Sequence, residues 1–272
     1  MNLTLIKKNP LSITTILADK LGIFDKHNVK VNLSLLEDFS FGGESPFYLG
    51  ESDGTVGDIT FFFYALEKGK KSIVTSNLTR TVMLVGRKDL PEKLEGIKVG
   101  VNRTGLFRLF LENDLKDKVI NPEIVWINNT YERMEALKNG EIDALVAIEP
   151  FVTEVVNNGG KILWSSRESK HNFVSWFFDE EYVNKNPKEI ENFHKALNEA
   201  AELFNNSSKE EKTRLCRDVI GYSEEVSNLL KEFIFEKEDI YSEEDFNLCQ
   251  RWMIKEGEIT NYYDPKKLIF RY

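Results

Sequence analysis

Thr104 and Gly105 have the residue types and the position of an anion-binding turn. They follow the apolar segment IKVGV and precede LFRLFLENDL, whose apolar residues recur at helical spacing. The first amides of a helix have no partner inside it, and the helix dipole is positive at that end, so an anion can bind there. Thr104 has a second interpretation as the residue that caps this helix, and the sequence leaves both open.

Two carboxylates occupy comparable positions. Glu149 follows the apolar segment IDALVAI and precedes Pro150, so its side chain is expected at the rim of a sheet, where it could receive a cation or an amino group. An ion pair with Arg80 or Arg103 is the alternative for Glu149. Asp58, in the segment GDIT, is either a ligand-binding carboxylate or a local hydrogen-bond acceptor at the end of a strand.

Aromatic residues make up 12% of the chain, which favours a flat pocket for a heteroaromatic ligand. Phe39 and Phe41 are the stronger candidates, because they lie in a segment without periodicity, where phenylalanine is hard to assign to a core. Phe61 and Trp176 lie in segments with helix or strand character, where burial in the core is the more frequent outcome. The remaining candidates for a ligand site are the polar residues Asn9, Ser12 and Thr60.

Helices and strands that alternate along the chain would bring these residues together. Residues 128–163 show the pattern well: a helix that ends at Gly140, the buried strand IDALVAI, a break at Glu149–Pro150, and the helix FVTEVVNN. The same alternation in most of the chain predicts the α/β class, with mostly parallel sheets flanked by helices. In open sheets of this class, ligands bind beyond the carboxyl ends of the strands.

Five segments, in this order, resemble the type II periplasmic binding proteins. The resemblance is to the branch of ABC-importer receptors that capture nitrate, aliphatic sulfonates, taurine and thiamine-pyrimidine precursors. The segments are Leu17 to Glu37, Val56 to Val74, Leu90 to Val101, Ala136 to Phe151, and the tail YVNKNPKEIENFHKALNEAAELF. Each motif is weak alone, and their order makes the resemblance specific.

The resemblance implies a two-lobe α/β fold with a hinged cleft that closes on a ligand. Lobe one would comprise residues 1–87 and 180–272, and lobe two residues 88–179. The implied ligand is a small organic anion such as a sulfonate, bound at helix ends, or a heteroaromatic compound such as a pyrimidine precursor. The implied partner is an ABC permease, and we expect a monomer without a cofactor or a bound metal.

Composition excludes several other functions. A net charge of −9 is unsuited to binding nucleic acid or an anionic membrane. No run of about 18 apolar residues is long enough to span a bilayer. The three histidines, at positions 27, 171 and 194, have no companion at metal-ligand spacing, and the common nucleotide-binding and hydrolase motifs are absent.

Two other functions and two locations stay open. An enzyme with the same fold, such as a dehydratase or lyase of the menaquinone-pathway type, is one alternative, and a cytoplasmic ligand sensor is the other. Asp19 and Lys20 interrupt the first apolar run, so no secretory signal is evident and the fold is expected to begin at Met1. We expect the protein outside the cytoplasm if an export signal has been removed, and in the cytoplasm otherwise.

Overall fold

The computed structural model describes residues 1–37 and 45–271 of the chain. It divides into two compact units, each with its own five-stranded sheet. Unit 1 consists of Met1–Thr79 and Phe173–Tyr272, and unit 2 of Arg80–Asn172. Unit 2 is therefore one continuous segment, whereas unit 1 is assembled from the two ends of the sequence.

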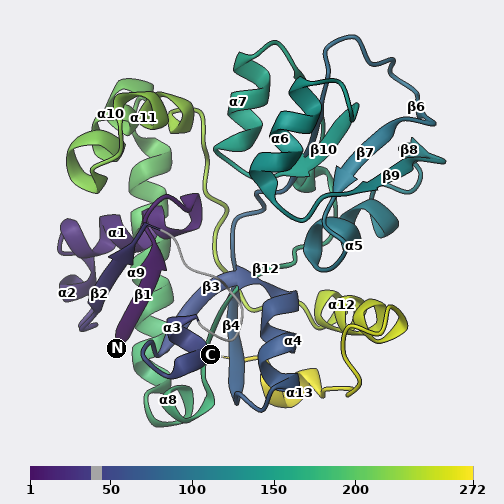
Figure 1. Ribbon diagram of the computed structural model, residues 1–272. Coiled ribbons are helices and arrows are strands. Elements are labelled where there is room, and N and C mark those ends of the chain that lie inside the picture. Colours follow the sequence, from purple (N-terminus) through teal and green to yellow (C-terminus); the bar gives the residue numbers. More distant parts are fainter. Residues whose placement is uncertain (38–44, 272) are drawn as a thin grey trace. The chain divides into compact units, whose positions relative to one another are not determined.

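The sheet of unit 1 is parallel except for one strand (Figure 1). Its strands, in sheet order, are β2 (Asn32–Leu36), β1 (Asn2–Ile6), β3 (Gly54–Asp58), β12 (Val174–Asp179) and β4 (Ser72–Asn77). β1 pairs in parallel with β2 and β3, while β12 runs antiparallel to both β3 and β4. Every residue of β12 before Asp179 is buried, so this late strand belongs to the interior of unit 1.

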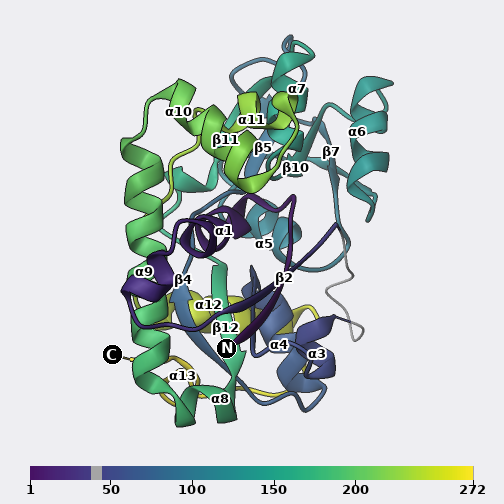
Figure 2. The same ribbon diagram turned by 90° about the vertical axis from the view of Figure 1, so that its left-hand side faces the viewer.

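Helices and turns cover the sheet of unit 1. They are a 3₁₀ turn (Pro10–Ser12), α1 (Ile13–Lys20), α2 (Ile23–Lys26), α3 (Pro46–Leu49), α4 (Ile59–Glu67), α8 (Glu180–Lys185), α9 (Pro187–Asn206), α10 (Lys209–Arg214), a π-helix (Leu215–Ile220), α11 (Glu224–Leu230), α12 (Glu243–Lys255) and α13 (Pro265–Leu268). The long helix α9 packs against α1 (Figure 2). None of the helices in the described part of the chain is both long and apolar enough to cross a membrane.

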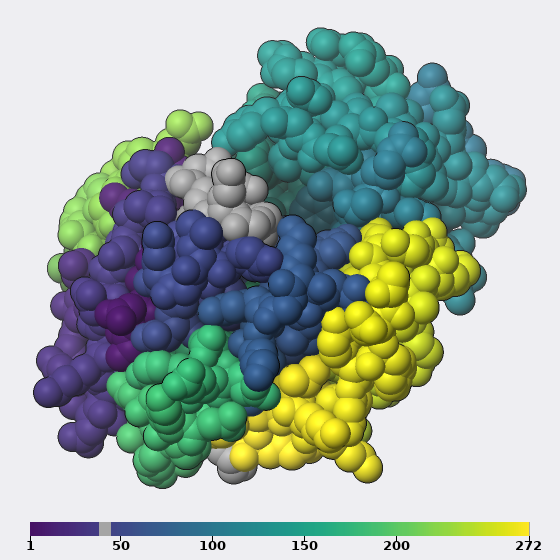
Figure 3. All heavy atoms as spheres, turned by 60° about the horizontal axis from the view of Figure 1, so that its bottom comes forward, coloured from purple at the N-terminus to yellow at the C-terminus, as the bar shows by residue number. Residues whose placement is uncertain are grey.

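The C-terminal residues are fastened to α4 by one carboxylate. Glu67 accepts hydrogen bonds from the backbone nitrogen of Asn261 and the hydroxyl groups of Thr260 and Tyr263, each at 2.9 Å. In Figure 3 these late residues, in yellow, lie against the blue surface that includes α4. The end of the chain is thus an integral part of unit 1.

The sheet of unit 2 has the strand order β11-β5-β10-β7-β9. The strands are β5 (Met83–Gly86), β7 (Lys98–Val101), β9 (Glu123–Trp126), β10 (Ala144–Ala147) and β11 (Lys161–Ser165), with a separate parallel pair of β6 (Leu94–Glu95) and β8 (Val119–Ile120). The helices are α5 (Leu106–Asn113), α6 (Thr130–Lys138) and α7 (Phe151–Asn157), and Ser166–Glu168 form a 3₁₀ turn. Only β5 runs against the others in the five-stranded sheet.

The two sheets follow the same plan. In each, one antiparallel strand lies between the third and fourth parallel strands: β12 between β3 and β4, and β5 between β10 and β11. Helices flank both sheets, which confirms the α/β prediction of two mostly parallel sheets. The antiparallel strands follow the two crossings of the chain between units.

These two strands also set the unit boundaries. The structure divides the chain after Thr79 and after Asn172, whereas the sequence motifs placed the divisions after residues 87 and 179. The difference is the segment containing β5, which pairs with strands of unit 2, and the segment containing β12, which pairs with strands of unit 1. Pairing partners far away in the sequence decide these positions, so no local pattern marks them.

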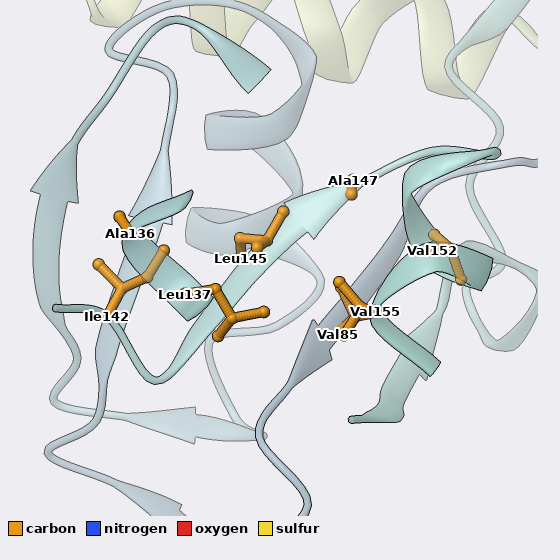
Figure 4. Close-up of a cluster of buried hydrophobic side chains, with 8 residues drawn as sticks. All are labelled: Val85, Ala136, Leu137, Ile142, Leu145, Ala147, Val152 and Val155. Carbon is orange, nitrogen blue, oxygen red and sulfur yellow. The ribbon is translucent and has the colours of Figure 1, made fainter. Parts of the chain in front are cut away.

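An apolar cluster holds α6 and α7 against the sheet of unit 2 (Figure 4). Ala136 and Leu137 of α6 lie on one side of Leu145 in β10, while Val152 and Val155 of α7 lie on the other. Each of these residues is buried. Complete burial of a valine or leucine side chain stabilises a fold by about 1.5–3 kcal/mol. The cluster packs the last turn of α6 and the body of α7 against the sheet.

Candidate functional site

Three loops lead from strands into helices at one edge of the unit 2 sheet. Residues 102–105 follow β7, residues 127–129 follow β9, and residues 148–150 follow β10. Because β7 pairs in parallel with both β9 and β10, all three loops lie at the carboxyl edge of the sheet. Three of the predicted site residues, Thr104, Gly105 and Glu149, are among them.

Gly105, and not Thr104, is the N-cap of α5. Its dihedral angles are φ 82° and ψ −166°, a region that is essentially restricted to glycine. Thr104 is exposed and its side chain does not cap the helix, so the capping interpretation of Thr104 was wrong. The start of α5 depends on the backbone conformation of Gly105. Capping side chains in the sequence give no sign of this conformation.

We expect Gly105→Ala to lower the free energy of unfolding by about 2 kcal/mol, because a side chain in this backbone region is strained. Thr104→Ala is the matched control, and for an exposed residue without a capping role its effect should stay within about 0.5 kcal/mol. Urea denaturation of both variants measures the difference. Equal unfolding midpoints would contradict the assignment of Gly105 as the strained position.

Glu149 lies directly before Pro150, the N-cap of α7, and binds the first turn of that helix. Its carboxylate accepts hydrogen bonds from the backbone nitrogen of Thr153 at 3.1 Å and from the Thr153 hydroxyl at 2.8 Å. Burial raises the pKa of Glu149, and the bonds from Thr153 oppose that shift. Among the described residues it forms no ion pair with Arg80 or Arg103; Arg80 donates to the carbonyl oxygen of Ser169 at 2.6 Å. In this structure the carboxylate of Glu149 is therefore held by Thr153 and not by these arginines.

Arg133 is a residue of this edge that the sequence interpretation missed. It is fully buried in α6 and donates to the carbonyl oxygens of Ile127 at 2.7 Å and Asn128 at 3.1 Å, and to the side chains of Asn102 and Thr130. It thereby ties the loop after β7 to the loop after β9. A spacing signal existed, because Arg133, Ala136 and Leu137 form one buried stripe of α6, but a charged residue is normally assigned to the solvent face.

The corresponding edge of unit 1 is built from local caps. The Asn9 side chain accepts from the backbone nitrogen of Leu11 at 3.0 Å, and the buried Ser12 hydroxyl donates to the carbonyl oxygen of Ile6 at 2.9 Å. Asp58 is the N-cap of α4 and accepts from the backbone nitrogen of Thr60 at 3.0 Å, as well as from the Thr60 hydroxyl. These bonds give Asn9, Ser12, Asp58 and Thr60 structural roles, and their contact with a ligand remains a prediction.

Burial raises the pKa of Asp58 to about 6 from an ordinary value of 3.8, against the opposing hydrogen bonds from Thr60. The pKa of Asp58 is higher in the folded state than in the unfolded state. Between about pH 3.8 and 6 the folded protein therefore keeps this proton, whereas the unfolded chain has lost it. The contribution of Asp58 to stability is therefore fully present below about pH 3.8 and is lost as the pH rises through about 6.

Asp58→Asn should accordingly be more stable than the wild type by about 3 kcal/mol at pH 7.5, and nearly equal to it at pH 4. The amide keeps an oxygen that can accept the bond from Thr60, so the cap is preserved. Urea denaturation at the two pH values provides the test. A variant that is no more stable than the wild type at pH 7.5 would show that the Asp58 carboxylate is not destabilised by burial.

The aromatic candidates divide into three groups. Trp176 is fully buried in β12, where it stacks on Phe178 with ring centroids 5.5 Å apart and meets Phe193 edge to face at 5.0 Å. Both neighbours belong to the core of unit 1, so the structure gives Trp176 a role in packing, and its contact with a ligand remains a prediction. Phe61 is half-buried in the first turn of α4. Phe39 and Phe41 lie outside the described residues.

The buried histidine of unit 1, His194, lies among polar side chains of the core. His194 of α9 lies with Nδ1 2.7 Å from a carboxylate oxygen of Glu238 and Nε2 3.0 Å from the Thr75 hydroxyl, and all three side chains are buried. Ser76 also donates to Glu238, at 3.1 Å. Within residues 1–37 and 45–271 no group of three or more His, Cys, Asp or Glu side chains is arranged to hold a metal ion.

Comparisons with known proteins give matches in structure only. No family model matches the sequence, and no curated protein matches it. The aliphatic sulphonate-binding protein SsuA from Escherichia coli superimposes over 100% of this chain and 92% of its own, with a TM-score of 0.80 and 15% identity. SsuA from Xanthomonas axonopodis pv. citri bound to MOPS covers 99% and 96%, with a TM-score of 0.70 and 11% identity, and the desulfurization enzyme DSZB covers 98% and 95%, with a TM-score of 0.61 and 14% identity.

This chain has the type II periplasmic-binding-protein fold. In such a fold, as in other open α/β sheets, ligands bind beyond the carboxyl ends of parallel strands. The predicted residues at those ends are Asn9, Ser12, Asp58 and Thr60 in unit 1, and Thr104, Gly105 and Glu149 in unit 2. Seven of the positions chosen from the sequence therefore lie at the carboxyl ends of strands, whereas Trp176 lies inside a strand, and their contact with a ligand remains a prediction.

Proposed function

We propose that this chain is a small-molecule solute-binding protein of an ABC importer. The observation that carries the proposal is the similarity in structure to SsuA over 100% of this chain and 92% of that one, which includes both units and the two crossings between them. The polar residues at the carboxyl edges of both sheets support it, because such edges are the ordinary ligand sites of open α/β sheets. The proposed ligand is a small organic anion of the sulfonate type, with a heteroaromatic compound as the other possibility.

In this proposal the two units close on the ligand about the segments that join them, at residues 79–80 and 172–173. The closed form is what a membrane permease would recognise, and the protein acts as a monomer outside the cytoplasm. Closure predicts a smaller radius of gyration in solution scattering when the ligand is added. An unchanged radius at saturating ligand would argue against closure.

Native mass spectrometry of the purified protein, followed by a thermal-shift screen, tests the function directly. The screen should contain sulfonates, carboxylates, phosphonates, amines and pyrimidines. A true ligand at 100 times its dissociation constant adds about 2.7 kcal/mol to the stability of the folded state, which is a readily measured shift. A protein that carries no small molecule and is stabilised by none of these classes would not be a receptor for such solutes.

An enzyme of the same fold is the second candidate, because the desulfurization enzyme DSZB is also similar over nearly the full chain. The two functions differ in the fate of the ligand. A receptor releases its ligand chemically unchanged, whereas an enzyme converts it. Nuclear magnetic resonance spectra of a stabilising compound, recorded before and after a day with the protein, distinguish these outcomes.

A further inference from the structure

Three arginines surround the turn between β7 and α5 in unit 2. Arg103 lies in the turn, Arg108 lies in the following helix, and Arg133 reaches the turn from α6 through its bond to the Asn102 side chain. The guanidinium carbons of Arg103 and Arg108 lie 5.3 and 5.4 Å from the ring centre of Trp126, within the range of a cation–π interaction. One indole therefore orients two of the three cations.

Arg108 is neutralised by a neighbour. Its Nε donates to the Glu112 carboxylate at 2.6 Å, and its NH1 group donates to the carbonyl oxygen of Arg103 at 3.1 Å. The first contact balances the charge of Arg108, and the second holds the backbone of the turn. Arg108 thus stabilises the backbone position of Arg103.

Arg133 brings a positive charge that no carboxylate balances within the described part of the chain. Its hydrogen-bond acceptors are backbone carbonyls, an amide and a hydroxyl, and its Nε has no partner. The guanidinium carbon also lies 5.5 Å from the ring centre of Phe107, in the first turn of α5. Burial lowers the pKa of Arg133 to about 10, so the group is still protonated at neutral pH.

Arg103 is exposed and is the cation of this turn that solvent can reach. Its backbone nitrogen donates to the Asn128 side chain at 3.0 Å, which fixes the position of the residue, and Trp126 orients its guanidinium. No carboxylate of the described residues pairs with it. Arginine binds an oxyanion through two parallel hydrogen bonds, and a guanidinium already held in place loses less entropy on binding.

Two cations without a carboxylate partner in the described part of the chain lie close together at this turn. The chain as a whole carries a net charge of −9, yet the charges of Arg103 and Arg133 at one turn are not balanced. The positive end of the α5 dipole adds to the same potential. These charges attract an anion to the turn.

We propose that Arg103, supported by Trp126, Arg108 and Arg133, recognises the oxyanion group of the ligand, which is a carboxylate, sulfonate or phosphonate. This inference rests on the proposed solute-binding function and adds the residue that selects for negative charge. Trp126 and Arg108 position Arg103, and the buried Arg133 adds a positive charge next to the turn. A neutral compound of the same shape would be bound weakly.

The first experiment needs no ligand. Of the four tryptophans, all of them described, Trp126 is 37% exposed, whereas Trp164, Trp176 and Trp252 are at most 9% exposed, so soluble quenchers of fluorescence report mainly on Trp126. At constant ionic strength we expect iodide to quench more effectively than caesium, despite the negative net charge. Arg103→Gln should reduce the iodide quenching constant about twofold and leave that of neutral acrylamide unchanged, because one charge about 5 Å away has been removed.

Two controls accompany this measurement. Arg87→Gln removes a positive charge at the end of β5, the opposite edge of the same sheet, and should leave iodide quenching unchanged. Trp126→Phe should remove the preference for iodide altogether. Equal iodide quenching in Arg103→Gln and wild-type protein would overturn the inference.

The second experiment measures affinity by calorimetry with butanesulfonate, pentanoate, butylphosphonate, the neutral butyl methyl sulfone, and pentylamine. The three anions should bind and the sulfone and amine should not. Arg103→Gln should weaken binding of the anions by about 10- to 100-fold, Arg103→Lys should weaken it less, and Arg87→Gln should have almost no effect.

The outcomes separate this inference from the proposed function. Binding of the sulfone or the amine as tightly as the anions would overturn the role of Arg103 and leave a solute-binding protein with another ligand class. An equal loss of affinity in Arg103→Gln and Arg87→Gln would also overturn it. Binding of none of the five compounds would count against recognition of an oxyanion, and native mass spectrometry decides separately whether the protein carries a solute.

Discussion

Replacing Arg133 by methionine is expected to lower the stability of unit 2 by about 3 kcal/mol. Methionine fills a similar volume but cannot donate to Ile127, Asn128, Asn102 or Thr130, which are the acceptors that Arg133 now satisfies. Loss of the buried charge offsets only part of this effect, because acceptors left in the interior keep their own desolvation penalty. The loops after β7 and β9 would then move independently.

Hydrogen exchange detected by mass spectrometry can localise this effect. Amides of residues 102–106 and 127–133 should exchange faster in Arg133→Met, whereas those of β12 in unit 1 should not change. Lys138→Met is the matched control, because it removes one positive charge from the same helix at a position whose side chain is 74% exposed. Similar exchange in the two variants would show that Arg133 does not hold the loops.

Gly54→Ala should destabilise unit 1 by about 3 kcal/mol. An added Cβ at Gly54 would lie 2.4 Å from two ring carbons of Phe178, the residue opposite it in β12. That ring has little room to move, because it stacks on Trp176 at 5.5 Å and meets Phe193 at 5.6 Å. The strain must therefore be relieved by separating β3 from β12.

Gly57→Ala, in the same strand, is the control for this substitution. There the added Cβ would lie 3.6 Å from Phe61 and 3.7 Å from Phe177, which are ordinary contact distances. Urea denaturation followed by near-ultraviolet circular dichroism should give a lower midpoint for Gly54→Ala and a change within about 1 kcal/mol for Gly57→Ala. Equal midpoints would mean that the β3–β12 contact adapts without strain.

The class of the fold could be predicted from the sequence because its signals are local. Short apolar runs of four to six residues indicate the strands β1, β7, β10 and β11, and the segments between them show helical periodicity. Both patterns can be read from neighbouring residues alone. The position of β12 between β3 and β4 is different, since it depends on pairing with residues more than 90 positions away. Local patterns carry no information about such a partner.

The candidate site was predictable to a similar extent. Polar residues directly after buried strands were found, because the carboxyl end of a strand is visible in the sequence. The burial of Trp176 was not predictable, since an aromatic side chain in a strand looks the same in the sequence whether it faces the core or a ligand. Arg133 was missed for the opposite reason, because its burial depends on four acceptors that only the folded loops bring together.

The antiparallel strand β12 also has a consequence for the order in which the protein folds during synthesis. β12 pairs with β3 on one side and with β4 on the other. Both of these strands leave the ribosome about 100 residues before β12. The sheet of unit 1 therefore cannot be completed until Asp179, the last residue of β12, has emerged. Unit 2 has no such delay, because β5 precedes the strands it joins and the unit is one continuous segment. The inserted unit can therefore fold first, while the N-terminal strands wait with open edges for a chaperone or for the rest of the chain.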